Sequence, residues 1–465
     1  MRTIVRSTPV RSIGLAGRFI LGTGLAVMIA ATSACKGDTG GDRATAQETK
    51  PAPELDALEV TPLTAAGDEV PLPSSPVAYA DELAALDQRI EGIQARVEST
   101  APSWLTLQTL ADALAERAHL SGDYDDYAAA EAALAKAFEL APAGSGPRMS
   151  RARLHFTLHR LGAALVDLEA ASNRINVKKH EKASNDGLRA DIAFQRGDYE
   201  VARTEFERLA EAVPGMSATS RLATYRWKTG DFDGADALYL EALRSYTGTA
   251  AQPRAWLRLM RGLLDLDRGR HRQAYAHYQN AAAELSGYWL VEEHIAEIRG
   301  ILGEVAPATA LYRDLIERTG NPEFMDALAE LLAEGGEAAE AEKMRQRARK
   351  AYEELLERYP EAAAGHAIDH FFADEGAKER VVELAESNHR LRPNGAAKIL
   401  LAKALLVAGE AERAEGMILE VLASPWRSAE LHEVASEVFA ARGDQERATA
   451  ELAKAKAIDT SIGGG

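Results

Sequence analysis

The feature that most constrains this chain is a turn residue that returns at nearly regular intervals along most of its length. Successive turns are 33 to 40 residues apart, which is the period expected when one small helical unit is repeated. Nine of the turns carry a glycine, and one divergent copy carries a histidine. The turn residues are Gly122, His159, Gly197, Gly230, Gly269, Gly303, Gly336, Gly376, Gly409 and Gly443. The sequence therefore predicts about ten repeated units.

The residues on either side of each turn predict two helices that pack closely together. Seven residues before the turn the side chain is small in nearly every unit, as at Ala190, Ala223 and Ala329. Five residues after the turn most units have alanine, as at Ala202 and Ala235. Small side chains at both places let antiparallel helices approach each other, and larger ones then fill the next layer. The larger side chains expected there are Phe206, Tyr239, Tyr278 and Tyr312.

Two segments carry this pattern most clearly, GDYEVARTEFERLAEAVP from Gly197 to Pro214 and GDFDGADALYLEAL from Gly230 to Leu243. Both resemble the turn and second helix of a tetratricopeptide repeat (TPR), and the resemblance covers roughly residues 104–458. It implies an all-α fold, a right-handed α-solenoid of antiparallel helix pairs with about ten repeats in residues 101–465. It also implies a concave groove that recognises a protein or peptide. Spacings of 37 to 40 residues indicate longer helices or loops at some junctions.

The first 34 residues have the physical properties of a signal peptide. Arginines precede an uncharged apolar run from Phe19 to Ala34, and no acidic residue occurs before Asp38. The run is short for a transmembrane helix and ends directly before Cys35, the only cysteine. It resembles a bacterial lipobox, which implies a lipoprotein signal peptide at residues 1–34 and acylation of Cys35. The alternatives are an uncleaved anchor helix and an ordinary secretory signal with an incidental cysteine.

The next two segments are expected to join the anchor to the repeats. Residues 35–77 begin with the acylated cysteine and are rich in Gly, Pro, Thr and acidic residues, which predicts a flexible linker. Residues 78–100 have apolar side chains at alternating steps of three and four, which predicts an amphipathic helix. Those side chains are Leu83, Leu86, Ile90, Ile93 and Val97. We expect this helix to cap the first repeat, and the alternative is a dimerising helix.

The charge of the chain restricts its partners. It has 54 basic and 71 acidic residues, a net charge of −17, and removal of the arginine-bearing signal would make the remainder more acidic still. Such a surface repels phosphate backbones, so nucleic acid is not expected as a partner. A basic protein or peptide, or a cation, fits the charge better. The alternative is that the acidity serves only solubility.

Motifs typical of enzymes are missing from the sequence. It has no Gly-rich phosphate loop after a strand, no nucleophile elbow, no second cysteine and no HExxH. We therefore expect a binding protein that makes no covalent chemistry and has no cofactor.

Three units carry paired ionisable residues ten and six positions before the turn, on one face of the first helix. These groove-binding candidates are Glu293, Glu297, Asp326, Glu330, His366 and His370, and His294 lies beside the first pair. Because neighbouring helices are about 8–10 Å apart, such side chains can converge on one cation. The metal candidates are His366, His370, Asp326 and Glu330, for Zn²⁺ or another borderline divalent ion. Asp369 takes a position that is small elsewhere, and is expected to support one of the histidines. Solvated acidic faces and simple His–carboxylate pairs are the structural alternative.

Two other groups of residues are interpreted as structural. Trp227, Trp256 and Trp289 are expected in the core between helix pairs. Asn388, Arg392 and Asn394 are expected to end a second helix before Pro393. Neither group enters the predicted site.

These observations favour a periplasm-facing, lipid-anchored scaffold or adaptor of the bacterial cell envelope that holds a segment of another protein in its groove. Lys36 follows the anchor cysteine, so the aspartate that favours inner-membrane retention in some lineages is absent, and the outer membrane is mildly preferred. The main alternative is a metal-binding envelope protein, either a divalent-cation carrier or a metal-dependent hydrolase. A purely architectural role in a homo-oligomer is a third possibility.

Overall fold

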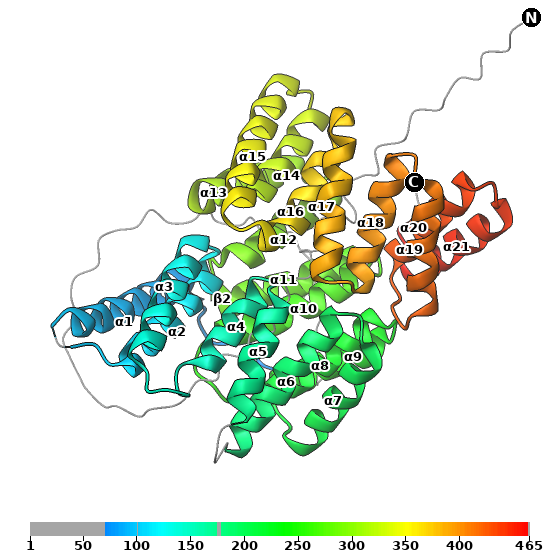
Figure 1. Cartoon of the computed structure of the whole chain (residues 1–465). Helices are drawn as coiled ribbons and strands as arrows, with labels where there is room; N and C mark the ends of the chain where they lie inside the picture. The colour runs from blue at the N-terminus through cyan, green and yellow to red at the C-terminus, as the bar shows by residue number, and fades with distance from the viewer. Residues whose placement is uncertain (1–69, 100, 174–177, 464–465) are drawn as a thin grey trace, which may run out of the picture.

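The computed structural model describes residues 70–99, 101–173 and 178–463, and within them the chain forms 21 α-helices (Figure 1). Helix α1 (Tyr79–Ser99) is followed by ten consecutive helix hairpins, so the predicted all-α solenoid of antiparallel helix pairs is confirmed. The hairpins are α2 (Trp104–Ser121) with α3 (Tyr124–Leu140), α4 (Arg148–Thr157) with α5 (Leu161–Ser172), α6 (Lys179–Gln195) with α7 (Tyr199–Ala212), α8 (Met216–Lys228) with α9 (Phe232–Ser245), α10 (Gln252–Leu266) with α11 (His271–Glu284), α12 (Trp289–Ile301) with α13 (Val305–Thr319), α14 (Pro322–Glu334) with α15 (Ala338–Arg358), α16 (Pro360–Phe372) with α17 (Lys378–Leu391), α18 (Gly395–Val407) with α19 (Ala411–Ala423), and α20 (Ala429–Ala441) with α21 (Gln445–Ile458).

The turn within each hairpin depends on a residue with positive φ. Eight of the nine predicted turn glycines have φ between 68° and 89°, a region that glycine enters without steric cost. His159 takes the same place in the second hairpin with φ of 59°, and it is the only residue other than glycine with positive φ among the described residues. The sequence therefore identified even the divergent turn correctly.

The turn at Gly376 is the exception and corrects one prediction. Gly376 does not have positive φ; five residues separate α16 from α17, and three of them form a short 3₁₀ helix (Glu375–Ala377). The turn between α14 and α15 is only three residues long, so the helix before Gly376 is displaced by two positions in the repeat frame. The small, fully buried residue of α16 is Ala367, whereas Asp369 is exposed. Asp369 therefore does not occupy the packed position that the spacing suggested.

Packing within and between hairpins follows the predicted layers. Ala190 and Ala202 are fully buried where α6 meets α7, and the larger residues of the next layer are also buried. Those residues are Phe206, Tyr239, Tyr278 and Tyr312. One apolar core runs continuously from Leu86 in α1 to Ala448 in α21. Each hairpin thus buries its apolar face against its neighbours, as a solenoid requires.

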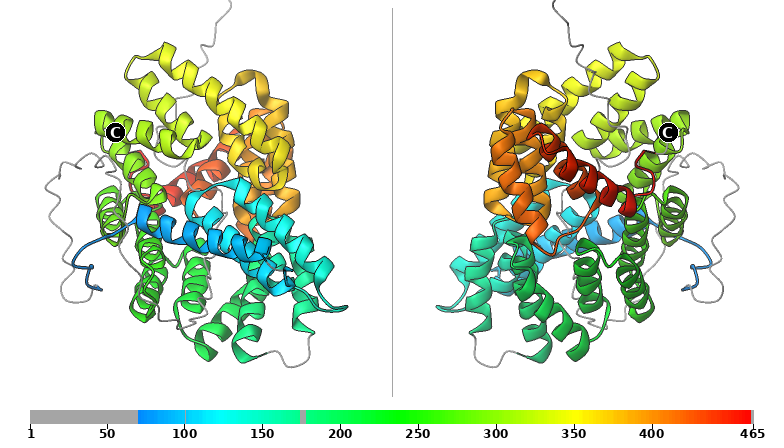
Figure 2. Two further views of the ribbon diagram at one scale, coloured as in Figure 1. Left: turned by 90° about the vertical axis from the view of Figure 1, so that its left-hand side faces the viewer. Right: turned by 90° about the vertical axis from the view of Figure 1, so that its right-hand side faces the viewer.

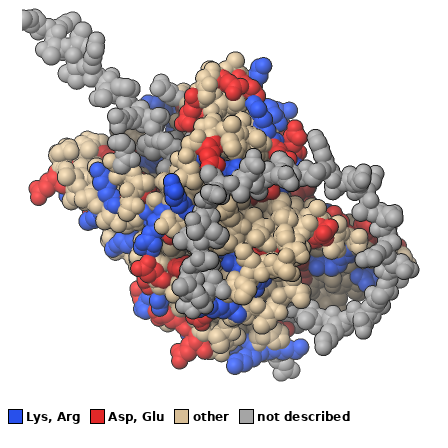
Figure 3. Space-filling model, turned by 180° about the vertical axis from the view of Figure 1, so that it is seen from behind, with Lys and Arg blue, Asp and Glu red and all other residues tan. Residues whose placement is uncertain are grey.

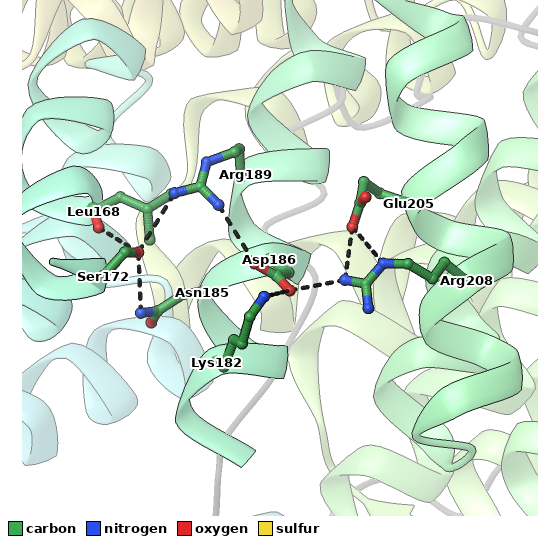
Figure 4. A network of polar contacts seen from close by, with 8 residues as sticks. All are labelled: Leu168, Ser172, Lys182, Asn185, Asp186, Arg189, Glu205 and Arg208. Carbon is green, nitrogen blue, oxygen red and sulfur yellow. Dashed lines mark hydrogen bonds and ion pairs between the residues drawn. The ribbon is translucent and has the colours of Figure 1, made fainter. Parts of the chain in front are cut away.

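The junction between the second and third hairpins is held differently. Helices α4, α5 and α6 enclose a separate small apolar core, and polar contacts join α5, α6 and α7 around it (Figure 4). Asp186 accepts hydrogen bonds from Lys182 (2.9 Å) and Arg208 (2.7 Å), and Asn185 donates to Ser172 (3.2 Å). Lys182 and Arg208 are largely exposed, and exposed ion pairs contribute about 1 kcal/mol or less. At this junction, polar contacts therefore supplement a small apolar core.

The solenoid turns far enough for its last hairpins to lie against its early ones (Figure 2). Tyr359 Oη donates to the carbonyl oxygen of Tyr124 at 2.9 Å, and Gly395 N donates to Tyr199 Oη at 2.6 Å. Further along, Arg427 N donates to the carbonyl oxygen of Lys228 at 2.9 Å. We call the contacts between residues 358–460 and residues 124–268 the closure.

The N-terminal residues of the described chain pack against the solenoid. Helix α1 buries Leu86, Ile90 and Ile93 and packs on α2. Ahead of it, strand β1 (Val77–Ala78) pairs in parallel with β2 (Leu285–Ser286). Arg258 also donates to the carbonyl oxygen of Val70 at 2.8 Å. The folded body therefore begins before the expected boundary at residue 78.

The remaining N-terminal predictions concern residues outside the description. The proposed signal peptide, Cys35 and the linker up to residue 69 all lie there. Within the described ranges no helix has the length and apolar character needed to cross a membrane.

Candidate functional site

The closure encloses a cavity of about 730 Å³ on the inner face of the solenoid. Its walls come mainly from the first helices of successive hairpins, namely α2, α4, α6, α8, α10, α12, α14 and α16, with one side formed by α15. First helices face inward because each hairpin presents the same side to the axis of the superhelix. We call this cavity the chamber.

Aromatic side chains form much of the chamber wall. The aromatic residues that line it are Tyr124, Tyr127, Phe156, Phe194, Phe206, Tyr225, Trp227, Trp256, Tyr288, Trp289, Phe324 and Tyr352. The three tryptophans were predicted to belong to the core; Trp227 and Trp256 are indeed buried, but all three also line the chamber. The indole nitrogen of Trp227 donates to Asp267 at 2.8 Å, and that of Trp289 donates to the carbonyl oxygen of Leu120 at 2.9 Å. Their rings are therefore held in fixed orientations.

The charged residues of the chamber have an excess of carboxylates. The acidic ones are Asp123, Asp125, Asp191, Asp267, Glu293, Glu323 and Glu354, and the basic ones are Arg221, Lys228, Arg318 and Arg358. On the outer face shown in Figure 3, acidic and basic side chains are interspersed. The excess of carboxylates in the chamber agrees with the net charge of −17 of the chain.

Two buried ion pairs stand in the wall. Arg221 contacts both carboxylate oxygens of Asp191 at 2.9 Å, and burial raises the pKa of Asp191 although the arginine opposes the rise. Lys228 lies 3.6 Å from Asp267 and 3.6 Å from the centre of the Trp227 ring. Burial lowers the pKa of Lys228 and raises that of Asp267. Neither pair is free to move without leaving a buried charge uncompensated.

Two histidines of the chamber are held neutral by burial. Burial lowers the pKa of His119 to about 4. Burial also lowers the pKa of His159, and the neighbouring Arg392 guanidinium lowers it further. At neutral pH these rings therefore add hydrogen-bonding groups to the wall and no positive charge.

The six predicted groove residues lie in different environments. Glu293 and His366 line the chamber, and His366 Nδ1 is 2.5 Å from Glu323. His370 is buried, with Nδ1 at 2.9 and 3.0 Å from the two carboxylate oxygens of Asp326.

Asp326 and His370 do not line the chamber, and the remaining two predicted residues also lie away from its wall. Glu297 is almost fully buried beside His294, and Glu330 is half-buried. Neither of them lines the chamber.

The four predicted metal ligands do not converge on one point. His370 is paired with Asp326 and His366 with Glu323, so the histidines use separate carboxylates. Among the described residues, the group of three or more potential ligands whose atoms all lie within 4.8 Å is instead Glu293, His294 and Glu297. The reason is the two-residue displacement in α16, which moves His366 and His370 out of the frame of the pairs on α12 and α14.

Sequence reasoning missed the residues that shape the chamber by closing it. Asn394 caps the following helix α18 by accepting from Ala397 N at 3.0 Å, and its amide nitrogen donates to Gln195 at 2.8 Å. Arg392 is 2% exposed and donates to Asn388 at 2.6 Å. All three were interpreted as ending a helix. These three polar residues are buried because the early hairpins pack against them across the closure.

The chain is therefore an α-solenoid of TPR-type helix hairpins closed around an aromatic, acidic chamber. No protein-family model matches its sequence, and neither does any curated protein. Among solved structures, a tetratricopeptide repeat protein from Parabacteroides merdae is 19% identical, with 54% of this chain and 93% of that chain covered and a TM-score of 0.32. Human IFIT1, solved as a dimer with m7Gppp-AAAA, is 16% identical over 81% of this chain and 94% of that chain, with a TM-score of 0.38. Yeast Tom70 is 15% identical over 81% and 89% of the two chains, with a TM-score of 0.36. The likeness concerns the fold alone.

Proposed function

We propose that this protein is a membrane-tethered scaffold or adaptor that holds a segment of another protein in its chamber. The observation that carries the proposal is the cavity of about 730 Å³ with aromatic walls and an excess of carboxylates. Its size lies within the range of about 300–1,000 Å³ that is usual for ligand sites. A chamber built by so many successive hairpins suits an extended or helical segment of a partner.

The chemistry of the wall favours a basic segment. Lysine and arginine side chains bind well to aromatic faces, and each such contact contributes about 0.5–2 kcal/mol. The surplus carboxylates supply acceptors for charge-assisted hydrogen bonds to the same cations. Phosphate groups would be repelled, so we do not propose a nucleic-acid ligand.

Membrane tethering is the second part of the proposal. Lipidation of Cys35 would attach the chain to the bacterial envelope, with the linker holding the folded body on the periplasmic side. Lys36 favours the outer membrane, and assembly of the envelope is the process we propose for the adaptor. Membrane fractionation of the wild-type chain and of Cys35→Ala tests this part. Release of the variant into the soluble fraction is expected, and retention equal to wild type would contradict lipid anchoring.

Binding in the chamber can be tested with two neighbouring residues of α15. Glu354 lines the chamber and Glu353 does not, although both are exposed. Because the three chamber tryptophans report on an occupant, Lys- and Arg-rich peptides can be titrated into the purified chain by fluorescence. Glu354→Lys should weaken binding about tenfold, since reversal of one charge near a cation costs on the order of 1–2 kcal/mol. Glu353→Lys should bind as the wild type does.

Two outcomes would overturn the proposed binding mode. One is an absence of any saturable fluorescence change with basic peptides. The other is equal affinity of the wild type and Glu354→Lys, which would place the peptide outside the chamber. If instead Glu354→Lys weakens binding as expected, crosslinking of the anchored chain in cells with the same two variants would identify the partner.

A further inference from the structure

One cluster beside the chamber contains more ionisable groups than its contacts can satisfy. Glu293, His294 and Glu297 lie on α12, and all three are buried, His294 completely. His294 Nδ1 is 3.1 Å from Glu293 Oε2 and 3.2 Å from Glu297 Oε2. One ring nitrogen carries at most one proton, so it cannot donate fully to both carboxylates. As a set of hydrogen bonds the cluster is incomplete.

The same distances suit a metal ion. In a tetrahedral site with bonds of about 2.0–2.1 Å, neighbouring ligand atoms are about 3.3–3.4 Å apart, and an octahedral site brings them to about 3.0 Å. The two separations from His294 Nδ1 match these values, and the three ligand atoms all lie within 4.8 Å of one another. The three ligand atoms are therefore close enough for one ion to be shared among them.

Charge favours the same occupant. Glu293 and Glu297 bring two buried carboxyl groups to the same imidazole. Two carboxylates and a neutral imidazole around a divalent cation sum to zero charge, which is the arrangement that a buried site tolerates best.

Two tyrosines give independent support. Tyr278 and Tyr312 have no exposed surface, and neither hydroxyl has a hydrogen-bond partner within the described chain. The Tyr278 ring stacks on His294 with centroids 5.5 Å apart. Both hydroxyls are close enough to interact electrostatically with Glu293 and Glu297. Buried hydroxyls without partners are rare and indicate an additional ligand or a bound water.

We propose that Glu293, His294 and Glu297 form a binding site for a divalent transition metal at the wall of the chamber. One imidazole and two carboxylates favour Zn²⁺, Co²⁺ or a similar borderline ion over Mg²⁺ or Ca²⁺, which prefer oxygen ligands alone. Glu293 lines the chamber and gives the ion a route of entry. The tyrosine hydroxyls would lie around the ligands and accept or donate through a metal-bound water. The proposal does not require a peptide in the chamber.

The test uses the purified full chain, stripped with a chelator and loaded with Zn²⁺ or Co²⁺ alone. After desalting we expect one metal ion per chain, and for Co²⁺ a visible absorption typical of low coordination. Glu297→Gln and Glu293→Gln, which keep the side-chain shape, should each lose at least 100-fold in affinity. The double variant His366→Gln/His370→Gln, which removes the histidines of α16, should bind as the wild type does.

A second measurement covers the case in which the glutamine variants do not fold. X-ray absorption at the Zn edge of the wild type should show a single imidazole among oxygen ligands. Two imidazoles, or binding lost in the α16 double variant, would overturn the assignment to α12. A wild-type chain that retains no metal after desalting would overturn the proposal as a whole.

Discussion

Arg392, the C-cap residue of α17, donates a hydrogen bond from Nη1 to Nε2 of His159, 3.0 Å away, although 233 residues separate the two along the chain. His159 is the residue that turns the second hairpin with positive φ, and Arg392 is almost completely buried. Because both groups are withdrawn from water, separation of the hairpins would break this hydrogen bond and leave His159 Nε2 without its buried donor. This hydrogen bond therefore joins the second hairpin to the end of α17, next to the chamber.

Removal of Arg392 should loosen the closure. We expect Arg392→Met to lower the free energy of unfolding by about 2–4 kcal/mol, because His159 and Asn388 both lose a buried partner. The exposed Arg390 on the same helix provides a control, since Arg390→Met should change stability by about 0.5 kcal/mol or less. Urea unfolding gives the free energies.

Hydrogen exchange separates loosening of the closure from general destabilisation. In Arg392→Met the amides of α18, with Gly395 N among them, should exchange faster because Gly395 N donates across the closure to Tyr199. The amides of α10, which takes no part in the hydrogen bonds of Arg392, should keep wild-type rates. Uniform acceleration along the chain would mean that the closure has no separate opening.

The buried His119 should make stability depend on pH. Its pKa falls from 6.5 to about 4 on folding, so its contribution is present above pH 6.5 and is lost as the pH falls toward 4. At pH 5 the wild type should have lost about 2 kcal/mol through this residue. The cost of His119→Leu should therefore be about 2 kcal/mol smaller at pH 5 than at pH 7. Urea midpoints at both pH values give the comparison.

The variant must be compared with the wild type at each pH because other buried groups change the stability with pH in the opposite direction. Burial raises the pKa of Asp265 to about 6, so its contribution is present at low pH and is lost as the pH rises through 6. His180, which is exposed, serves as the control through His180→Leu. If the cost of His119→Leu were the same at both pH values, the ring would be solvated and not held neutral.

The buried pair of Asp191 and Arg221 should be costly to break but not costly to remove. Arg221→Met leaves a buried carboxylate without its partner and should destabilise by about 3–5 kcal/mol. Addition of Asp191→Leu should recover at least 1 kcal/mol of that loss. The exposed pair of Arg203 and Glu200 is the control, since Arg203→Met should cost about 1 kcal/mol or less. A double variant less stable than Arg221→Met would show that the pair is a net source of stability.

The repeats were predictable because their signals are local. A positive φ after the first helix, and small residues where two helices meet, depend on a few neighbouring positions, and the period then repeats them. Even His159 kept its place in the frame. The error at Gly376 arose because a five-residue turn preserves the spacing of glycines while it displaces α16 by two positions. His366 and His370 were therefore assigned to the wrong positions of the repeat.

The chamber was not predictable because it depends on the sum of many small rotations between hairpins. No local pattern reports where Tyr359 will meet Tyr124 or where Gly395 will meet Tyr199. The tryptophans show the same limit, since a buried aromatic residue has the same sequence pattern whether a cavity lies on its other side or not. Polar residues at positions such as Arg392 were the available signal, and their burial became visible only in the folded chain.

Two turn glycines allow the steric contact across the closure to be separated from the cost of backbone strain. Gly197 and Gly409 both have φ of 82°, so alanine at either position has the same intrinsic cost of about 1–2 kcal/mol. A Cβ at Gly409 meets no atom within 4 Å, whereas one at Gly197 would lie 2.9 Å from the carbonyl oxygen of Pro393. Gly197→Ala should therefore cost at least 1 kcal/mol more than Gly409→Ala in urea unfolding. In the background of Arg392→Met, where the hairpins can separate, the excess should shrink. Equal costs of the two alanine variants in the wild-type background would mean that the last hairpins do not press on the early ones in solution.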